Sequence, residues 1–414
     1  MGQVFSEDTD MYLKKGEIID KIFYITIGCY FVFSAMTLTM LEDIAILELV
    51  AKLSRYICYA LLLVVIVCNI ITNDKGLSLK SICVDFFEYF KSHLLLVAVL
   101  VNTFFILLFT GVKAPFIMML LIWTCSFYDF DKIFALYFKI MASFMVCTGV
   151  LSILGIVPEI IIWRGDRQRF SIGFIYPLET MTFFLFLVIC YVYIKKKEFG
   201  IKDFFEINIV AGLLYVATNA RTSYLLVLVV LCIALMYSKT PLEEWMKKIP
   251  GKVYAIIPLA CAGVSICGGL FYNPQNSIWQ KIDALVSGRL ALTSNAFRTY
   301  DFTLWGEAIE WVGFGGTADQ AQVAAAYNFV DCAYARLLLD YGIVFTCFVL
   351  AGYMYMYIQA EKKQDYGLIV ALSVVMVVSI MEPRLVSIEM NPFLLLLGEF
   401  FLLRNRSSFK FVHE

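Results

Sequence analysis

The chain is organised as long apolar runs separated by short polar turns. A helix needs about 20 apolar residues to cross the roughly 30 Å hydrocarbon layer of a membrane. By this criterion the pattern predicts twelve membrane helices, at residues 18–41, 53–72, 93–111, 114–128, 133–157, 172–194, 203–219, 221–238, 252–271, 331–358, 366–382 and 391–403. The expected fold is all-α, a polytopic membrane protein in which residues 1–414 form a single integral membrane domain.

One long polar stretch interrupts this pattern. Residues 272–330 lie between the ninth and tenth predicted membrane helices and are rich in polar, glycine and arginine residues. Apolar positions around Leu285 and Leu290 are spaced as in amphipathic helices that lie against a membrane surface. We therefore expect a large re-entrant or amphipathic helical loop here. Residues 159–170 form a second, shorter polar segment.

Composition supports a membrane protein and excludes several other classes. Hydrophobic residues make up 61% of the chain and charged residues only 16%, whereas about 25% of residues are charged in soluble domains. The net charge of −1 gives no sign of nucleic-acid binding. The 12 cysteines lack paired spacing and there are two histidines, so we predict no disulfide framework, no metal site and no cofactor.

Basic residues predict how the chain is oriented. Lysine-rich turns alternate with the predicted helices so that they fall on one side, at residues 14–15, 195–198, 243–252, 361–363 and 404–410. The positive-inside rule makes that side cytoplasmic. Both termini are then expected in the cytoplasm, and residues 272–330 on the outer face of a bacterial cytoplasmic membrane.

Arginines follow a different distribution. Most of them lie at or near the predicted outer side: Arg55, Arg164, Arg167, Arg169, Arg221, Arg289, Arg298, Arg336 and Arg384. The planar guanidinium group binds phosphate and carboxylate oxygens bidentately, so this concentration favours an anionic ligand at the outer face. The alternative is that individual arginines anchor helix ends at lipid headgroups.

Two arginines are the leading candidates for binding that ligand. Arg221 lies in a tight turn between two apolar runs, with Asn219 beside it; the alternative role is interface anchoring. Arg289 follows Gly288, which permits close approach of a ligand. If one helix carried Arg289 and Arg298, their nine-residue separation would place them on opposite faces at about 100° per residue. We expect Arg289 to face the ligand and keep Arg298 as a substrate contact.

Acidic and aromatic residues near the end of the loop are candidates for sugar recognition. Asp331 precedes a long apolar run, where its alternative role is an ordinary helix N-cap. Tyr334 follows at i+3 and is expected to offer a flat surface to a sugar. Arg336 points elsewhere and is expected to pair with Asp340 at i+4.

Three stretches together resemble a known family. The runs "LVSGRLAL", "LWGEAIEWVGFGG" and "VDCAYARLLLDYGIVF", within residues 284–345, are similar in order and spacing to Wzy-type O-antigen and capsular polysaccharide polymerases, especially those of Gram-positive bacteria. "NARTSYLLVL" upstream supports the likeness. This sequence has Glu307 and Glu310 in the "WGEAIEW" part, where the family more often has Gln at the first. Asp331 stands where the related O-antigen ligases would have histidine, which favours a polymerase.

The resemblance implies a GT-C-like membrane glycosyltransferase that joins undecaprenyl-diphosphate-linked repeat units. Arg221 and Arg289 would stabilise the departing diphosphate. Asp331 would act as general base, with Glu307 and Glu310 as further acidic candidates that contact substrate. A single displacement implies inversion of the anomeric centre. The reaction is expected to need no metal, because arginine can neutralise the diphosphate. Expected partners are the lipid-linked donor and acceptor, the bilayer, a chain-length regulator and a flippase.

Two alternatives remain open at this point. An O-antigen ligase-like transferase would use similar chemistry on another acceptor. A lipid-linked oligosaccharide flippase or transporter would also have about twelve membrane helices, with ionisable groups near the bilayer midplane. Glu179, Glu206 and Lys139 lie inside predicted membrane helices and keep the flippase alternative open.

Overall fold

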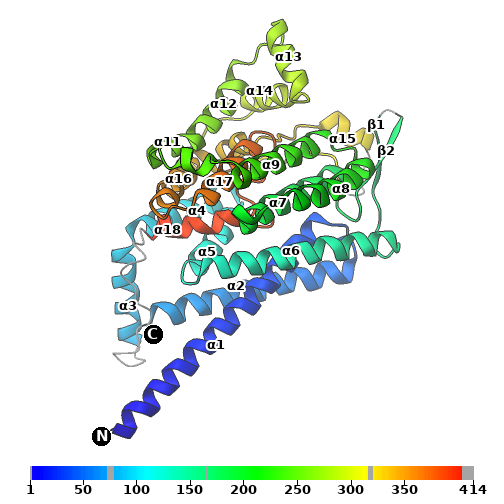
Figure 1. Cartoon of the computed structure of the whole chain (residues 1–414). Helices are drawn as coiled ribbons and strands as arrows, with labels where there is room; N and C mark the ends of the chain where they lie inside the picture. The colour runs from blue at the N-terminus through cyan, green and yellow to red at the C-terminus, as the bar shows by residue number, and fades with distance from the viewer. Residues whose placement is uncertain (1, 72–78, 165, 316–319, 403–414) are drawn as a thin grey trace.

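The protein is largely helical (Figure 1). The computed structural model describes residues 2–71, 79–164, 166–315 and 320–402. The predicted apolar runs correspond to α1 (Gly2–Ala35), α2 (Ala45–Ile70), α4 (Leu94–Thr110), α5 (Ala114–Cys125), α6 (Phe130–Ile153), α7 (Pro177–Lys195), α8 (Ile201–Thr218), α9 (Arg221–Lys239), α12 (Ile257–Phe271), α16 (Ala333–Lys362), α17 (Tyr366–Val378) and η4 with α18 (Pro392–Leu396, Leu397–Phe401). Shorter connecting helices are η1 (Met36–Leu38), α3 (Leu79–Ser92), η3 (Lys196–Glu198), α10 (Leu242–Met246) and α11 (Gly251–Tyr254).

The predicted count of twelve membrane-spanning helices is not confirmed by the length and composition of the described helices. Within the described residues, seven helices are long and apolar enough to cross a membrane, or eight if the bent pair at 82–92 and 94–110 counts as one. That pair meets at 95°. The 12 residues of α5 rise only about 18 Å at 1.5 Å per residue. Hydropathy alone locates apolar segments but does not show that each one spans the bilayer.

The predicted largely α-helical fold is confirmed, with one short β-hairpin that the sequence reasoning did not predict. Residues 159–170 contain an antiparallel hairpin of β1 (Ile161–Arg164) and β2 (Arg167–Phe170). Ile162 pairs with Arg169, and both side chains are buried. The β-branched run before Trp163 favours a strand, a signal that the hydropathy pattern does not separate from a polar turn.

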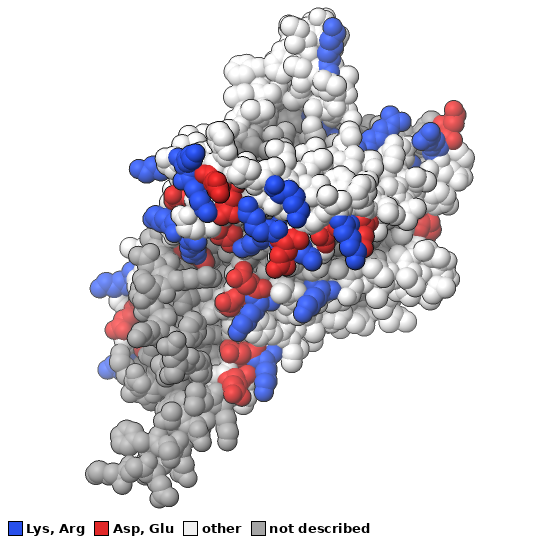
Figure 2. Space-filling model, viewed as in Figure 1, with Lys and Arg blue, Asp and Glu red and all other residues white. Residues whose placement is uncertain are grey.

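The helix ends gather on two opposite sides, as the alternation of lysine-rich turns predicts. On the lysine side, the Lys196 ammonium lies 2.9 Å from an Asp365 carboxylate oxygen, and Lys197 lies 3.2 Å from Glu243. Figure 2 shows charged side chains gathered towards the α11 end of this face, with a largely uncharged surface between them and the β1–β2 hairpin. The predicted basic turn at 404–410 lies outside the described residues.

The opposite side, which we call the arginine side, carries the long polar segment 272–330. It contains α13 (Ser277–Leu285), α14 (Arg289–Thr299) and α15 (Gln320–Ala326), joined by irregular chain. In Figure 1, α13 projects beyond the end of α12, and α14 lies beside that end. Thr293 and Phe297 of α14 pack so closely on Gly269 of α12 that a side chain at that glycine would overlap them. This contact fixes α14 over the end of the helix bundle.

A pair of glycines joins two of the family-like stretches. Gly342 has a φ of 81° and marks a kink in α16, and Gly306 has a φ of 87°. Residues 303–307 lie against this kink, where the Glu307 N–H donates to the Leu339 carbonyl at 2.9 Å and the Ile343 N–H donates to the Thr303 carbonyl at 3.0 Å. The inserted chain thus supplies hydrogen bonds that the kink would otherwise leave unmade.

Gly342→Ala is therefore expected to destabilise the fold strongly. A Cβ at Gly342 would lie 2.4 Å from the Gly306 backbone nitrogen, and the positive φ alone costs on the order of 1–3 kcal/mol for other residues. We expect a lower melting temperature and less monodisperse protein after detergent extraction. Gly212→Ala in α8 is the control, because a Cβ there meets no atom within 4 Å. Equal melting temperatures for the two variants would contradict this account.

Candidate functional site

The position of Arg289 is set by the way α14 begins. Arg289 is the first helical residue and follows Gly288, which has a φ of 83° that glycine adopts without strain. The Asp283 carboxylate accepts the N–H groups of Leu290 at 2.9 Å and Ala291 at 3.1 Å. This acid satisfies amides that the helix start leaves without partners. The turn thus directs the Arg289 side chain into the protein, where it is 8% exposed.

The buried guanidinium group lies between two carboxylates. Its Nε is 3.1 Å from Oδ2 of Asp331, and its Nη2 is 3.6 Å from Oε1 of Glu382. Asp331 comes just before α16, and Glu382 belongs to the irregular segment 379–391 between α17 and η4. A buried charge is stable only when it is paired, so these acids hold Arg289 in place.

Glu382 is connected to two further helices. The Thr182 hydroxyl of α7 donates to Glu382 Oε2 at 3.2 Å, and the Ser223 hydroxyl of α9 lies 3.4 Å from that of Thr182. Burial raises the pKa of Glu382 to about 7, although Arg289 acts in the opposite direction. We call Arg289, Asp331, Glu382, Thr182 and Ser223 the Arg289 cluster. Near neutral pH its net charge changes with the protonation of Glu382.

Asp331 is the more accessible of the two acids. Its side chain is 18% exposed, against 3% for that of Glu382. Burial raises the pKa of Asp331, and the neighbouring Arg289 charge partly offsets this. The ordinary N-cap role does not apply, because the N-cap of α16 is Cys332. The Asp331 carboxylate instead pairs with Arg289 and remains partly open to solvent.

The 379–391 segment carries two more charged contacts on the arginine side. Arg384 pairs with Glu179 in the first turn of α7. Glu389 accepts a hydrogen bond from Ser34, and Ser387 donates to it at 2.8 Å. This short irregular segment therefore links the Arg289 cluster with the C-terminal end of α1 and the N-terminal end of α7.

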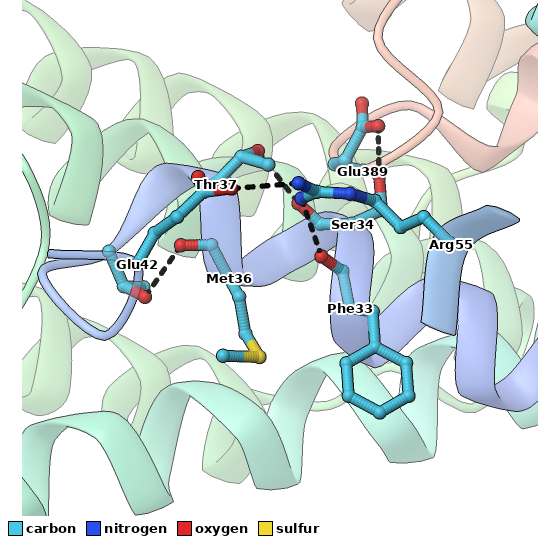
Figure 3. A network of polar contacts seen from close by, with 8 residues as sticks. Phe33, Ser34, Met36, Thr37, Glu42, Arg55 and Glu389 are labelled. Atoms are coloured by element: carbon cyan, nitrogen blue, oxygen red, sulfur yellow. Dashed lines mark hydrogen bonds and ion pairs between the residues drawn. The ribbon is translucent and has the colours of Figure 1, made fainter. Parts of the chain in front are cut away.

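A second polar network lies at the turn between α1 and α2 (Figure 3). Arg55 of α2 donates to Glu42 at 2.8 Å and to the Phe33 carbonyl at 3.1 Å. Figure 3 shows Ser34 pointing to Glu389, so this network lies next to the 379–391 segment. Its arginine is engaged by local partners, which favours a structural role in holding the turn.

A row of aromatic side chains leads from the hairpin to the Arg289 cluster. Arg169 of β2 lies 5.4 Å from the ring centroid of Tyr176, whose ring is 6.5 Å from that of Phe314, which in turn is 5.2 Å from Tyr327. The pKa of Tyr327 is raised by burial first and then by the negative charge of Asp331. The Tyr327 end of this row is therefore close enough to Asp331 to be influenced by its charge. Aromatic faces of this kind suit the apolar faces of sugars.

The two residues predicted in the α8–α9 turn occupy different environments. Arg221 is the first residue of α9 and is exposed. Asn219 is buried in the left-handed conformation with a φ of 49°, and its side-chain oxygen has no hydrogen-bond partner within the described residues. Ser223, two residues after Arg221, reaches the Arg289 cluster through Thr182. The turn thus borders the cluster, with Arg221 facing solvent.

The predicted contrast between the two arginines of α14 is confirmed by their burial. Both lie on this one helix, where Arg289 is buried and Arg298 is exposed. Glu307 is half-buried and accepts the N–H of Asp301 at 3.4 Å. Glu310 is exposed, and its backbone carbonyl accepts from Asn328 at 3.1 Å. Among the described residues, Arg289 forms ion pairs with Asp331 and Glu382 and with neither of these two acids.

Tyr334 does not offer an open ring. Its side chain is fully buried, and its hydroxyl donates to the Met376 carbonyl at 2.8 Å. A pyranose could not stack on this ring without unpacking α16 from α17, so we leave Tyr334 out of the proposed site. The predicted pair of Arg336 and Asp340 is confirmed at 2.8 Å. Trp311 donates to the same Asp340 carboxylate at 2.7 Å, which anchors the "WGEAIEW" stretch to α16.

Sequence reasoning missed Glu382 as a site residue and placed Arg384 only among the arginines near the predicted outer side. The stretch "MEPRL" places two charges around a proline directly after an apolar run. Ionisable residues in such a position are costly in a membrane protein and so indicate function or pairing. The sequence pattern predicts a helix at 366–382, with Glu382 as the last residue of that helix. In the structure α17 ends at Val378, four residues earlier.

Comparisons with known proteins returned no match to a family model, to a curated protein or to a solved structure. A functional assignment therefore depends on the residues and their geometry.

Proposed function

We propose that this protein is a polysaccharide polymerase of the bacterial cytoplasmic membrane. It would join undecaprenyl-diphosphate-linked repeat units at the outer face, with both termini in the cytoplasm. The observation that carries the proposal is the Arg289 cluster, in which one buried guanidinium group lies between Asp331 and Glu382 on the arginine side. The family-like stretches around these residues support the same reaction, and the arrangement would be GT-C-like.

The proposed chemistry divides between Arg289 and Asp331. The anomeric carbon of the donor loses its bond to the diphosphate, and negative charge grows on the leaving oxygen. The guanidinium group has five N–H donors. Its Nε pairs with Asp331 and its Nη2 with Glu382. A phosphate oxygen would take a remaining donor, stabilising the leaving group. The more exposed Asp331 would accept the proton of the attacking acceptor hydroxyl. One displacement inverts the anomeric centre, without a metal.

Other outer-side residues have supporting roles in this proposal. Arg221 and Arg298 are exposed and would attract the diphosphate before it reaches Arg289. The aromatic row of Tyr176, Phe314 and Tyr327 would contact the glycan. A chain-length regulator and a flippase remain expected partners.

The flippase alternative receives little support from the charged residues that suggested it. Glu206 is exposed and lies 3.7 Å from Lys202, Lys139 is exposed, and Glu179 pairs with Arg384 at the end of α7. A direct experiment separates the functions: purified protein is incubated with a lipid-linked repeat unit, and products are resolved by length. A polymerase yields a ladder, a ligase yields single transfer to another acceptor, and a flippase yields no new product.

The titration of Glu382 gives a pH prediction for the proposed reaction. Since the pKa of this buried acid is about 7, raising the pH from 6 to 8 converts it from mainly neutral to mainly charged. Arg289 and Asp331 face the same carboxyl, so ionisation adds a negative charge where the diphosphate binds. We expect the apparent KM for the donor to rise roughly tenfold over this range. Glu382→Gln should flatten that dependence, whereas an equally steep rise in the variant would assign it to another group.

A further inference from the structure

An apolar groove of about 390 Å³ runs along α7 between α6 and α8. The lining extends from Phe138 to Ile153 on α6, from Thr180 to Tyr191 on α7, and from Ile207 to Leu214 on α8. Its two hydroxyl groups are already engaged. Thr180 donates to the Ser171 carbonyl, and Tyr191 donates to Asp203 at 2.5 Å. The groove therefore presents an apolar surface.

The groove is open to the outside of the helix bundle and closed towards the protein core. Its rim residues Val146, Val150 and Ile153 are exposed, whereas Leu187 and Val188 on its floor are buried. A groove with this orientation in a membrane helix bundle takes a hydrocarbon chain from the bilayer, because water is absent at that depth. The remaining question is which kind of chain it holds.

The length of the groove favours a chain longer than one lipid leaflet. Phe138 and Ile153 are fifteen residues apart on α6, which corresponds to about 22 Å at 1.5 Å per residue. One leaflet of the hydrocarbon layer is roughly 15 Å thick. The acyl chain of a single phospholipid ends near the midplane, whereas a long polyprenyl chain continues into the second leaflet.

Polar groups adjoin the arginine-side end of the groove. A second cavity shares Ile153 and Ile172 with the groove and is also lined by Glu159 and Ala217. The Glu159 carboxylate is engaged by the Ile172 N–H at 2.8 Å and by the Ser152 hydroxyl at 2.5 Å.

Arg169 precedes Phe170, which lines this cavity. Arg169 is buried, and its Nε donates to the carbonyl of Thr218, the residue after Ala217, at 2.7 Å. Its guanidinium group also lies over the Tyr176 ring. From Tyr176 the aromatic row continues past Phe314 and Tyr327 towards Asp331. A chain in the groove would therefore emerge beside an arginine and a route to the Arg289 cluster.

We propose that the groove between α6 and α8 binds the polyprenyl chain of the lipid-linked substrate, with its phosphate end beside Arg169. This inference rests on the proposed function for the identity of the lipid. The groove and the Arg289 cluster lie on opposite faces of α7, because Thr180 and Leu187 line the groove while Thr182 contacts Glu382. The lipid chain and the reacting sugar are thus held on two sides of one helix.

Photolabelling in liposomes tests the proposal without requiring catalysis. One probe is a polyprenyl phosphate with a diazirine in its chain, and the comparison probe is phosphatidylglycerol with a diazirine in its acyl chain. We expect the polyprenyl probe to label α6 to α8 of the wild-type protein at least about fivefold more than the acyl probe does at equal concentration. Unlabelled polyprenyl phosphate should compete with this labelling.

Two groove-filling variants and one control complete the test. Ala142→Trp places a large ring in the groove, and Ser143→Trp places the same ring at the next, exposed position outside the lining. We expect about tenfold weaker labelling in Ala142→Trp and wild-type labelling in Ser143→Trp. Gly149→Leu is a second filling variant, because its Cβ would meet only Ile172, at 3.4 Å. Melting temperatures identify any variant that fails to fold.

The outcomes separate this inference from the proposed function. Equal labelling by the two probes, or unchanged labelling in both folded filling variants, would overturn the polyprenyl assignment. Arg289→Lys should keep wild-type labelling, since Arg289 lies away from the groove lining. If the protein is labelled as expected but forms no polymer from a lipid-linked repeat unit, the polymerase assignment fails while the polyprenyl site stands.

Discussion

Arg289→Lys is expected to lower the rate of polymer formation by roughly 10²–10³-fold, the effect of removing one preorganised donor from a charged transition state. Lysine keeps the positive charge but loses the planar fork that lies between Asp331 and Glu382. A single ammonium group cannot reproduce contacts at Nε and Nη2 and also donate to a phosphate oxygen. Polymer length and initial rate in a reconstituted assay measure the effect.

Arg298→Lys is the matched control for this experiment. It makes the same chemical change on the same helix, nine residues later, at an exposed position. We expect at most a severalfold change in rate, because an exposed charge contributes mainly to attraction of the donor and is screened by salt. If both variants, or neither, lost polymer formation, the cluster would not have the special role that we assign to Arg289.

The charges of the cluster indicate that diphosphate binding there would depend on the geometry of Arg289 more than on the number of arginines. Arg289 and Asp331 neutralise one another, and Glu382 adds a negative charge only when ionised. The site is therefore not simply a basic surface that attracts any anion. A diphosphate would bind where the donors of one fixed guanidinium group remain directed at it, and this position depends on both acids and on the start of α14.

The sequence predicts part of this site well, for identifiable reasons. The placement of Arg289 and Arg298 on opposite faces follows from helical periodicity once both lie on one helix. The Arg336–Asp340 pair follows from i,i+4 spacing. The sidedness of the helix ends follows from the alternation of apolar runs and lysine-rich turns. Each of these predictions depends on local spacing, which can be read directly along the chain.

The parts that sequence reasoning missed depend on contacts between distant segments. Glu382 joins the cluster because α17 ends early and the following segment turns back towards α7 and α14, more than 90 residues away along the chain. Tyr334 was predicted to contact sugar from its position near Asp331, but packing of α16 on α17 buries it completely. Neither outcome is encoded in the spacing of neighbouring residues.

Asp331→Asn is expected to lower kcat for polymer formation by roughly 10²–10⁴-fold, the range for loss of a general base. Asparagine keeps the size of the side chain but does not accept a proton at neutral pH. If Asp331 acts as the base, the KM for the donor should change little, and the acidic limb of the pH profile of kcat should disappear. Single-repeat lipid-linked substrate should accumulate in cells that carry the variant.

A purely structural role for Asp331 predicts a different pattern. If the carboxylate served only to hold Arg289, its loss would raise the donor KM and lower the melting temperature, while kcat kept its dependence on pH. Asp301→Asn, the same change at an exposed position of the same loop, controls for general effects of removing a negative charge. Wild-type polymer from Asp331→Asn would exclude this carboxylate as the base. In that case Glu307 and Glu310 would remain as the other candidates for the base, and of these two only Glu310 is exposed.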